Sequence, residues 1–292
     1  MGKENSGYLL ILAAIGLWST IEVVTKYIHG AHGDVDPMSI AFVRFFLGAL
    51  LLIPYAIFKT RSEKGHSPDL HSVLRLLPSS FLGITLTFTL YHLALESVKA
   101  STSATIIAAV PLFSLPLSSI FLKERLSRRV AFAVLLGLLG VFLLSFEELG
   151  APGSMWGIVY LLGALVSFST FMVLNKNAGR EIGPHSATGF SIGLGALMFS
   201  PLLLVLGSPF IPELSPWSWV LLLYLGFLAT GVGYLLFFTG LDRVQTARGS
   251  SLFYLKPVFA FVLAVLILGE PVMLMSILGI VVVVFSVRMA LT

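Results

Sequence analysis

Long apolar runs separated by short polar gaps dominate the pattern of hydrophobic and polar positions along the chain. A helix needs about 20 apolar residues to cross the roughly 30 Å of hydrocarbon in a bilayer. Ten runs come close to or exceed this length, and the gaps between them are too short to build a soluble domain. The runs are Tyr8–Ile28, Pro37–Phe58, Ser72–Leu95, Ala100–Leu122, Val130–Phe146, Met155–Lys176, Pro184–Leu206, Pro216–Leu241, Thr246–Leu268 and Val272–Leu291. This pattern predicts an all-α integral membrane protein with ten transmembrane helices, called spans 1 to 10 in chain order.

The composition agrees with this prediction. Of the 292 residues, 57% are hydrophobic and only 11% are charged, whereas a soluble domain carries about 25% charged residues. So few charges cannot cover a soluble surface, and the apolar content also excludes a disordered chain. The absence of cysteine excludes structural disulfides, thiolate nucleophiles and thiolate metal sites. The net charge of +4 does not indicate nucleic acid, because the basic residues lie in the gaps between spans rather than on one clustered face.

The positions of the basic residues predict the orientation. If the N-terminus is cytoplasmic, fourteen of the eighteen Lys and Arg residues lie on the cytoplasmic side, as the positive-inside rule requires. These fourteen are Lys3, Lys59, Arg61, Lys64, Arg75, Lys123, Arg125, Arg128, Arg129, Lys176, Arg180, Arg243, Arg248 and Arg288. We therefore expect a multi-pass protein of the inner (cytoplasmic) membrane with both termini in the cytoplasm.

The two halves of the sequence match each other in three collinear blocks, which indicates a duplication. The blocks are Trp18-Ser19-Thr20 with Phe168-Ser169-Thr170, Leu47-Gly48-Ala49-Leu50 with Leu194-Gly195-Ala196-Leu197, and Pro111, Leu122 and Glu124 with Pro257, Leu268 and Glu270. We expect a first repeat at residues 1–147 (spans 1–5) and a second at 148–292 (spans 6–10). Because each repeat holds an odd number of spans, the second is predicted to lie inverted in the membrane. Inverted repeats are typical of secondary transporters.

These blocks resemble the EamA-type branch of the drug/metabolite transporter superfamily over nearly the whole chain. In the first half the resemblance rests on Trp18-Ser19 with Lys26, on Arg44, on Ala94-Leu95-Glu96, on Ala109-Val110-Pro111-Leu112-Phe113 and on Phe121-Leu122-Lys123-Glu124-Arg125-Leu126. In the second half it rests on Tyr224-Leu225-Gly226, Gly240-Leu241, Pro257-Val258-Phe259 and Leu268-Gly269-Glu270.

The resemblance implies ten helices, a central cavity lined by spans 1, 3, 4, 6, 8 and 9, and transport by alternating access. It implies export of amino acids or related metabolites, with the YddG-type exporters as the most similar group. We expect a monomer whose partners are a small-molecule substrate and the lipid bilayer, with no nucleic acid, cofactor, metal or enzymatic activity. The sequence departs from the family at Arg44, whose repeat partner is Ser191, and at Lys256, where relatives often carry an acidic or apolar residue.

Ionisable residues within the spans are candidates for function because burying an unpaired charge is costly. Lys256 lies near the middle of span 9, and we expect it either to attract a substrate carboxylate or to form a structural ion pair with Glu22. Glu22 lies four residues before Lys26 on one helical face, which favours a structural pair over proton exchange. Arg44 is expected to snorkel to the outer interface.

Several polar and aromatic side chains are further candidates for substrate binding. Tyr91-His92 ends span 3 with an aromatic wall and a hydrogen-bonding ring, although an interfacial aromatic pair fits as well. Packing and local backbone hydrogen bonds are the alternative for the other candidates. These are the aromatic residues Trp18, Tyr234 and Tyr254 and the hydroxyl residues Ser103, Thr170 and Ser251.

Other residues are expected to shape the helices. Pro111 and Pro257 occupy equivalent repeat positions and are predicted to act as hinges or kinks. Gly189 and Gly193 form a GxxxG face that indicates close helix packing. Glu124, like its repeat partner, is predicted to cap or latch a helix end.

Two other classes of protein remain alternatives at this stage. Gly249-Ser250-Ser251 together with His92 offers a serine and a base, as an intramembrane serine hydrolase requires. The duplication accounts for Ser251 without chemistry, however, so this alternative ranks low. A channel or facilitator for small solutes is the other alternative, although no span carries a ring-forming acidic pattern or a filter signature.

Overall fold

The computed structural model contains only helices and connecting segments within the part of the chain that it describes. The described residues are 2–21, 24, 25, 27, 28, 35–64, 68–95, 98, 103, 106–125, 127–144, 155–263, 266 and 274–291. The helices of the first half are α1 (Lys3–Trp18), α3 (Pro37–Lys64), α4 (Leu70–Leu74), α5 (Leu77–Ser80), the π-helical segment η1 (Phe81–Leu86), α6 (Thr87–Leu95), α8 (Val110–Leu122) and α9 (Arg128–Leu144). Those of the second half are α11 (Met155–Ile182), α12 (Pro184–Leu206), α13 (Pro216–Leu223), the π-helical segment η2 (Tyr224–Val232), α14 (Gly233–Asp242), α15 (Thr246–Ser251), the 3₁₀ turn η3 (Leu252–Tyr254), α16 (Leu255–Leu263) and α17 (Leu274–Leu291).

Within the described residues, six helical segments are long and apolar enough to cross a membrane, which confirms a multi-pass helical membrane protein. They are Pro37–Lys59, Leu70–Ala94, Met155–Ile182, Pro184–Leu206, Pro216–Asp242 and Leu274–Leu291. The other four predicted spans contain shorter described helices: α1, Ile106–Leu122, α9 and the α15–α16 stretch. Ten crossings therefore remain a prediction, since six helical segments of the described residues have the length and composition of a span.

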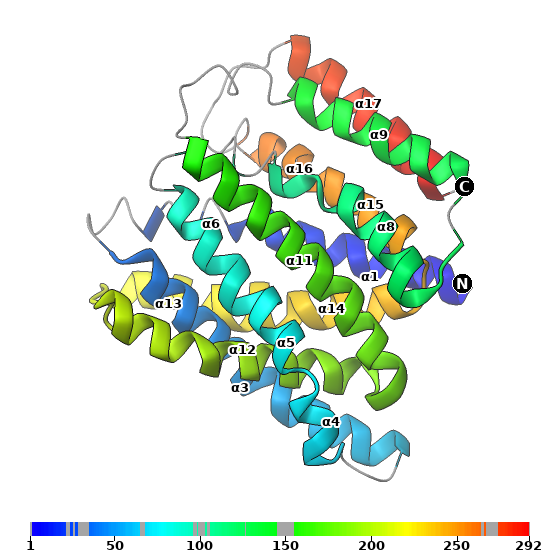
Figure 1. The fold of residues 1–292 in the computed structure, drawn as a ribbon. Coiled ribbons are helices and arrows are strands. Elements are labelled where there is room, and N and C mark those ends of the chain that lie inside the picture. The colour runs from blue at the N-terminus through cyan, green and yellow to red at the C-terminus, as the bar shows by residue number, and fades with distance from the viewer. Residues whose placement is uncertain are drawn as a thin grey trace.

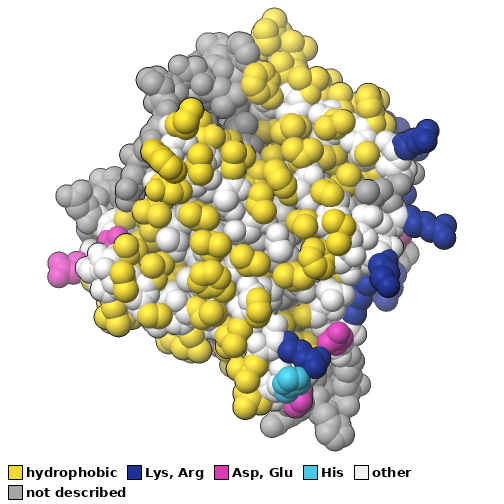
Figure 2. All heavy atoms as spheres, in the orientation of Figure 1, with side chains coloured by type: hydrophobic (Ala, Val, Ile, Leu, Met, Phe, Trp, Pro, Cys, Tyr) yellow, Lys and Arg dark blue, Asp and Glu magenta, His cyan; other side chains and the backbone are white. Residues whose placement is uncertain are grey.

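The surface is divided as a bilayer requires. Hydrophobic side chains cover most of the face seen in Figure 2, and charged side chains gather at its margins. Most Lys and Arg side chains in Figure 2 lie on the side of the labelled N and C termini of Figure 1, whereas acidic side chains lie both on the opposite side near α13 and beside Lys and Arg at the lower margin. Large apolar side chains such as Phe58, Val205 and Leu274 are more than two-thirds exposed, as lipid-facing residues are.

Helices from the two halves pair antiparallel, and glycines allow their backbones to approach. Figure 1 shows α9 beside α17 at one edge of the bundle and α3 beside α12 at the other. In α12, a Cβ atom added to Gly189 would lie 2.8 Å from the Leu52 carbonyl oxygen, and one added to Gly193 would lie 2.6 Å from Ile53 of α3. The predicted packing role of this GxxxG face is therefore confirmed.

The same antiparallel contact recurs where α1 meets α14. Gly7 lies against Gly240 and Val244, while Trp18, at the other end of α1, lies against Gly233. Between α9 and α17, Gly140 lies against the backbone of Val283 in the same way. Such close approach is how helices associate in lipid, where no hydrophobic force drives them together.

Departures from regular α-helix occur at corresponding places in the two halves. The π-helical segments η1 and η2 lie in spans 3 and 8, which are repeat partners. In spans 4 and 9 the irregularity precedes the matched prolines: Ala109 leaves helical geometry next to Pro111, and η3 comes just before Pro257. Wide or tight helical turns within a long helix often mark hinges and functional segments.

The contact between α1 and α14 predicts a position-specific effect of adding a methyl group. In Gly240→Ala the new Cβ would lie 2.6 Å from the Gly7 carbonyl oxygen, so the helices must separate at a cost of about 1–3 kcal/mol. We expect thermal unfolding of the purified protein to shift down by several degrees. Gly16→Ala on α1 is the control, since nothing lies within 4 Å of its added Cβ. Equal melting temperatures for both variants would contradict the close contact.

Candidate functional site

A cluster of four aromatic rings lies where span 1 of the first half meets spans 8 and 9 of the second. The Trp18 ring lies 5.1 Å from that of Tyr234, 4.9 Å from Phe237 and 5.6 Å from Phe253, measured between ring centroids. All four side chains are buried. The indole Nε1–H of Trp18 donates a hydrogen bond of 2.9 Å to the Ala229 carbonyl in η2. The structure thus brings the candidates Trp18 and Tyr234 together. The hydrogen bond to η2 fixes the orientation of the Trp18 indole N–H.

Arg44 lies inside the bundle, so the expectation that it snorkels to the interface is wrong. Its residue is 7% exposed, and the guanidinium carbon lies 4.6 Å from the ring centroid of Phe45 and 4.8 Å from that of Phe88. Phe45 in turn lies 6.1 Å from Tyr234. Snorkelling requires a helix face that meets lipid, whereas this face of α3 meets α6, and the charge lies over the rings of Phe45 in α3 and Phe88 in α6 through cation–π contacts.

A second buried charge lies at the end of the bundle where Lys and Arg gather. Lys176 of α11 donates hydrogen bonds from Nζ to Glu124 Oε1 at 2.9 Å, to the Val244 carbonyl at 2.6 Å and to Thr246 Oγ1 at 3.1 Å. Glu124 Oε2 accepts from the Thr246 backbone N–H at 2.8 Å. We call these four groups the polar latch. It joins the end of span 4 in the first half to spans 6 and 9 in the second.

Local backbone geometry brings Glu124 into the polar latch. Lys123 has a positive φ of 54° and ends α8 in the left-handed conformation, which turns the chain back toward α11 and α15. The predicted latching role of Glu124 is therefore confirmed. Lys176, counted from the sequence as a charge at the end of a span, is instead 7% exposed and lies six residues before the end of α11. The sequence did not reveal this because α11 continues beyond the apolar run.

The hydroxyl candidates mostly bond to nearby backbone. Ser251 Oγ donates to the Arg248 carbonyl at 2.6 Å, and Thr170 Oγ1 donates to the Val166 carbonyl at 2.8 Å. Tyr254 is fully buried, and its hydroxyl donates to the Val134 carbonyl of α9 at 2.8 Å. Each of these hydroxyls already has an acceptor in the chain. Ser103 is buried.

The remaining candidates lie apart from the aromatic cluster or outside the described residues. Tyr91 packs in a separate apolar group with Leu161, and its ring lies 5.8 Å from that of His92. Lys256 is half-buried near the start of α16, and its carbonyl accepts a hydrogen bond of 3.3 Å from Ser19 Oγ of span 1. Glu22, with its helical neighbour Lys26 and the repeat partner Glu270, lies outside the described residues.

A hydrogen bond close to one of the two hinge candidates links the halves. Pro111 lies in the first turn of α8, and Ser114, one turn later, donates to Ser250 Oγ of α15 at 2.8 Å. Pro257 lies just after Lys256 in α16. Within the described residues, no group of three or more His, Asp or Glu side chains could hold a metal ion.

The described part of the chain is an all-helical, multi-pass membrane protein, and comparison with known proteins specifies its family. The model of the EamA-like transporter family matches residues 5–146 and again residues 155–292. The chain belongs to the EamA-like transporter family of the drug/metabolite transporter superfamily. Its relatives and this family define it as a membrane protein for the transport of small solutes.

Known relatives cover almost the full chain. An "uncharacterized transporter" of Clostridium kluyveri is 28% identical, over 95% of this chain and 90% of the relative. One of Archaeoglobus fulgidus is 27% identical, over 92% of this chain and 90% of the relative. A crystal structure of a protein that is 19% identical has the same fold, with a TM-score of 0.81 over 98% of this chain and 96% of the other.

The polar latch predicts a large effect from single substitutions and a smaller one from a paired substitution. Lys176→Met leaves the Glu124 carboxylate without its cation in a buried place, which costs about 3–5 kcal/mol. We expect thermal unfolding of purified Lys176→Met to occur well below that of the parent, whereas Lys176→Met with Glu124→Leu recovers much of the loss.

Arg128→Met removes an exposed charge at the same end of the molecule and is the control, with little change expected. A Lys176→Met protein as stable as this control would contradict a buried, paired lysine.

Proposed function

We propose that the chain is a secondary transporter that exports amino acids or related small metabolites across the cytoplasmic membrane by alternating access. In this proposal ten spans form two inverted five-helix repeats, residues 1–147 and 148–292, in a monomer with both termini in the cytoplasm. The observation that carries the proposal is the polar latch, a buried contact between the two halves at one end of the bundle. Its position is that of a closed gate.

The inversion is supported by the direction of the paired helices. A two-fold axis in the membrane plane relates span 2 to span 7 and span 5 to span 10, and it requires each pair to run antiparallel. The glycine contacts of α3 with α12 and of α9 with α17 have that direction. The pairing of α1 with α14 has a counterpart in the pairing of α6 and η1 with α11, where Gly83 lies against Phe171 and Gly163 against Leu90.

Alternating access has two structural requirements. The halves must separate at some place, and some helical segments must bend. The polar latch and the hydrogen bond between Ser114 and Ser250 hold α8 against α11 and α15. Opening of this end breaks these contacts, while η1, η2, η3 and the turn at Ala109 provide bends in spans 3, 8, 9 and 4. Because this end carries most of the described Lys and Arg residues, we assign it to the cytoplasm.

In this proposal the substrate site forms beside the aromatic cluster when the two halves separate. Trp18 and Tyr234 supply an apolar wall for a substrate side chain, and Tyr91, His92, Ser103, Thr170, Ser251, Tyr254 and Glu22 remain flanking candidates. Lys256, half-buried beside the span 1 residue Ser19, attracts the substrate carboxylate. An ammonium–carboxylate contact in a partly dry cavity is a charge-assisted hydrogen bond and discriminates strongly by charge. Pro111 and Pro257 act as the hinges.

Substitution of Lys256 tests the substrate assignment. In proteoliposomes loaded with a panel of amino acids, Lys256→Ala is expected to slow transport of carboxylate substrates at least about tenfold, the loss of one charged hydrogen bond. Lys256→Arg keeps the charge and retains most transport, and decarboxylated amine analogues show no dependence on residue 256. Unchanged transport of every carboxylate substrate by Lys256→Ala would refute this role.

Counterflow tests the mechanism. Vesicles preloaded with unlabelled substrate are expected to accumulate labelled substrate transiently, because a carrier with one alternating site exchanges one molecule for another. The same assay with and without a pH gradient reports whether proton movement drives export. Labelled substrate that only equilibrates, at a rate independent of preloading, indicates a channel and contradicts alternating access.

A further inference from the structure

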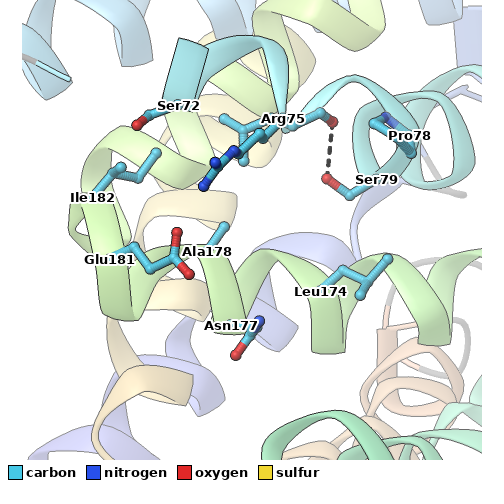
Figure 3. A pocket seen from close by; sticks show the side chains of 10 residues that line it. Ser72, Arg75, Pro78, Ser79, Leu174, Asn177, Ala178, Glu181 and Ile182 are labelled. Carbon is cyan, nitrogen blue, oxygen red and sulfur yellow. Dashed lines mark hydrogen bonds between the residues drawn. The ribbon is translucent and has the colours of Figure 1, made fainter. Parts of the chain in front are cut away.

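A cavity of about 320 Å³ lies outside the polar latch, where α4 and α5 meet the last turns of α11. Leu174, Ala178 and Ile182 form part of its apolar wall, and Arg75 and Glu181 bring opposite charges to it. Figure 3 shows the Arg75 side chain, from the turn after α4, and the Glu181 side chain, from α11, reaching toward the same space. The cavity is at the lower end of the volumes that hold small ligands.

Arg75 and Glu181 do not form an ion pair with each other. Among the described residues, neither Arg75 nor Glu181 forms an ion pair within 4.0 Å or a side-chain hydrogen bond. Both side chains are exposed on the cavity rather than folded back on the protein surface. A ligand that carries both a negative and a positive group can therefore bridge Arg75 and Glu181. Its binding does not require an ion pair within the protein to break.

The cavity lies at the depth of lipid headgroups. Arg75 follows the first turn of the apolar stretch Leu70–Ala94, and Glu181 lies in the last turn of the stretch Met155–Ile182. In the short helix α4, Leu70 is 73% exposed and Leu74 is 45% exposed. Exposed apolar side chains of this kind are typical of a helix that lies at the bilayer surface. Asp69 accepts a hydrogen bond of 3.2 Å from the Ser72 backbone N–H and so caps α4, and hydrogen bonds from Ser72 lower the pKa of Asp69.

We propose that this cavity binds the headgroup of an aminophospholipid of the phosphatidylethanolamine type. The Arg75 guanidinium donates charge-assisted hydrogen bonds to the phosphate, and the Glu181 carboxylate accepts from the primary ammonium. The glycerol and the first acyl carbons lie along Leu174 and Ile182. The lipid thereby bridges span 3 and span 6, one from each half, on the cytoplasmic side.

The charges of the lining distinguish this headgroup from other common ones. A phosphatidylglycerol headgroup brings no cation to Glu181, so its phosphate meets an unpaired carboxylate. A phosphatidylcholine headgroup has a trimethylammonium group, which donates no N–H hydrogen bond and is usually recognised by aromatic rings. No aromatic side chain lines this cavity within the described residues. The primary ammonium of phosphatidylethanolamine is the group that Glu181 matches.

Lipid titration of the purified full-length protein, followed by native mass spectrometry, tests the proposal. The probes are phosphatidylethanolamine, phosphatidylglycerol and phosphatidylcholine with identical acyl chains. We expect phosphatidylethanolamine to bind about tenfold more tightly than phosphatidylcholine, because a hydrogen bond between charged groups is worth roughly one decade in affinity. Equal affinities for the three lipids overturn the proposal.

Two variants assign the preference to its residues. Glu181→Gln is expected to reduce the preference for phosphatidylethanolamine over phosphatidylcholine to less than about twofold while phosphatidylglycerol binds more tightly, since the repelling carboxylate is gone. Arg75→Gln is expected to weaken the binding of all three lipids. Arg128→Gln and Glu213→Gln, exposed charges outside the cavity, are the controls and leave the affinities unchanged.

Soluble phosphoethanolamine distinguishes a lipid site from a site for a free metabolite. We expect it to compete only weakly, because it lacks the acyl chains that contact Leu174 and Ile182. Competition as strong as that of the lipid overturns the lipid assignment, and so does a Glu181→Gln protein that keeps the full lipid preference. Because Arg75 and Glu181 are exposed, unchanged thermal unfolding of both variants establishes that the lipid effects are local.

Discussion

Lys176 and Glu124 bury opposite charges between the two halves of the bundle, and several chain segments end where they meet. The left-handed Lys123 ends α8 there, and α15 begins there at Thr246. Arg180, one turn beyond Lys176, donates to the Leu122 carbonyl at 3.4 Å. In a low dielectric, charges stay buried only when they are paired and hydrogen-bonded. The pair therefore fixes how the ends of spans 4, 6 and 9 approach one another.

The rest of the bundle follows from the absence of water around it. Backbone groups must be satisfied within helices, so the described spans are helical. Hydroxyls such as those of Ser251 and Thr170 donate to nearby carbonyls. Glycines let the helices of the two halves touch. The wide turns η1 and η2 interrupt the regular α-helical hydrogen-bond pattern at corresponding places in the two halves. Close packing holds the helices together while the irregular turns give them places to bend.

The sequence predicted the helical membrane fold, the positions of the helical segments and the packing face of Gly189 and Gly193, because these follow from hydropathy and small-residue spacing. It also predicted that Glu124 holds a helix end. Arg44 was misjudged because hydropathy places a charge along a span but not around it, and Lys176 was misjudged because α11 continues beyond the apolar run. Whether an arginine faces lipid or the rings of Phe45 and Phe88 depends on long-range packing. The cavity at Arg75 joins segments far apart in sequence and has no sequence signature.

The proposed transport cycle requires the end held by the polar latch to open. The chain has no cysteine, so Ser114→Cys with Ser250→Cys introduces a single disulfide between α8 and α15, at a place where the two hydroxyl oxygens are 2.8 Å apart. We predict that the oxidised double variant in proteoliposomes stops counterflow, and that reduction restores it to the level of each single-cysteine variant. A fully cross-linked protein that exchanges substrate as fast as its reduced form would contradict the account.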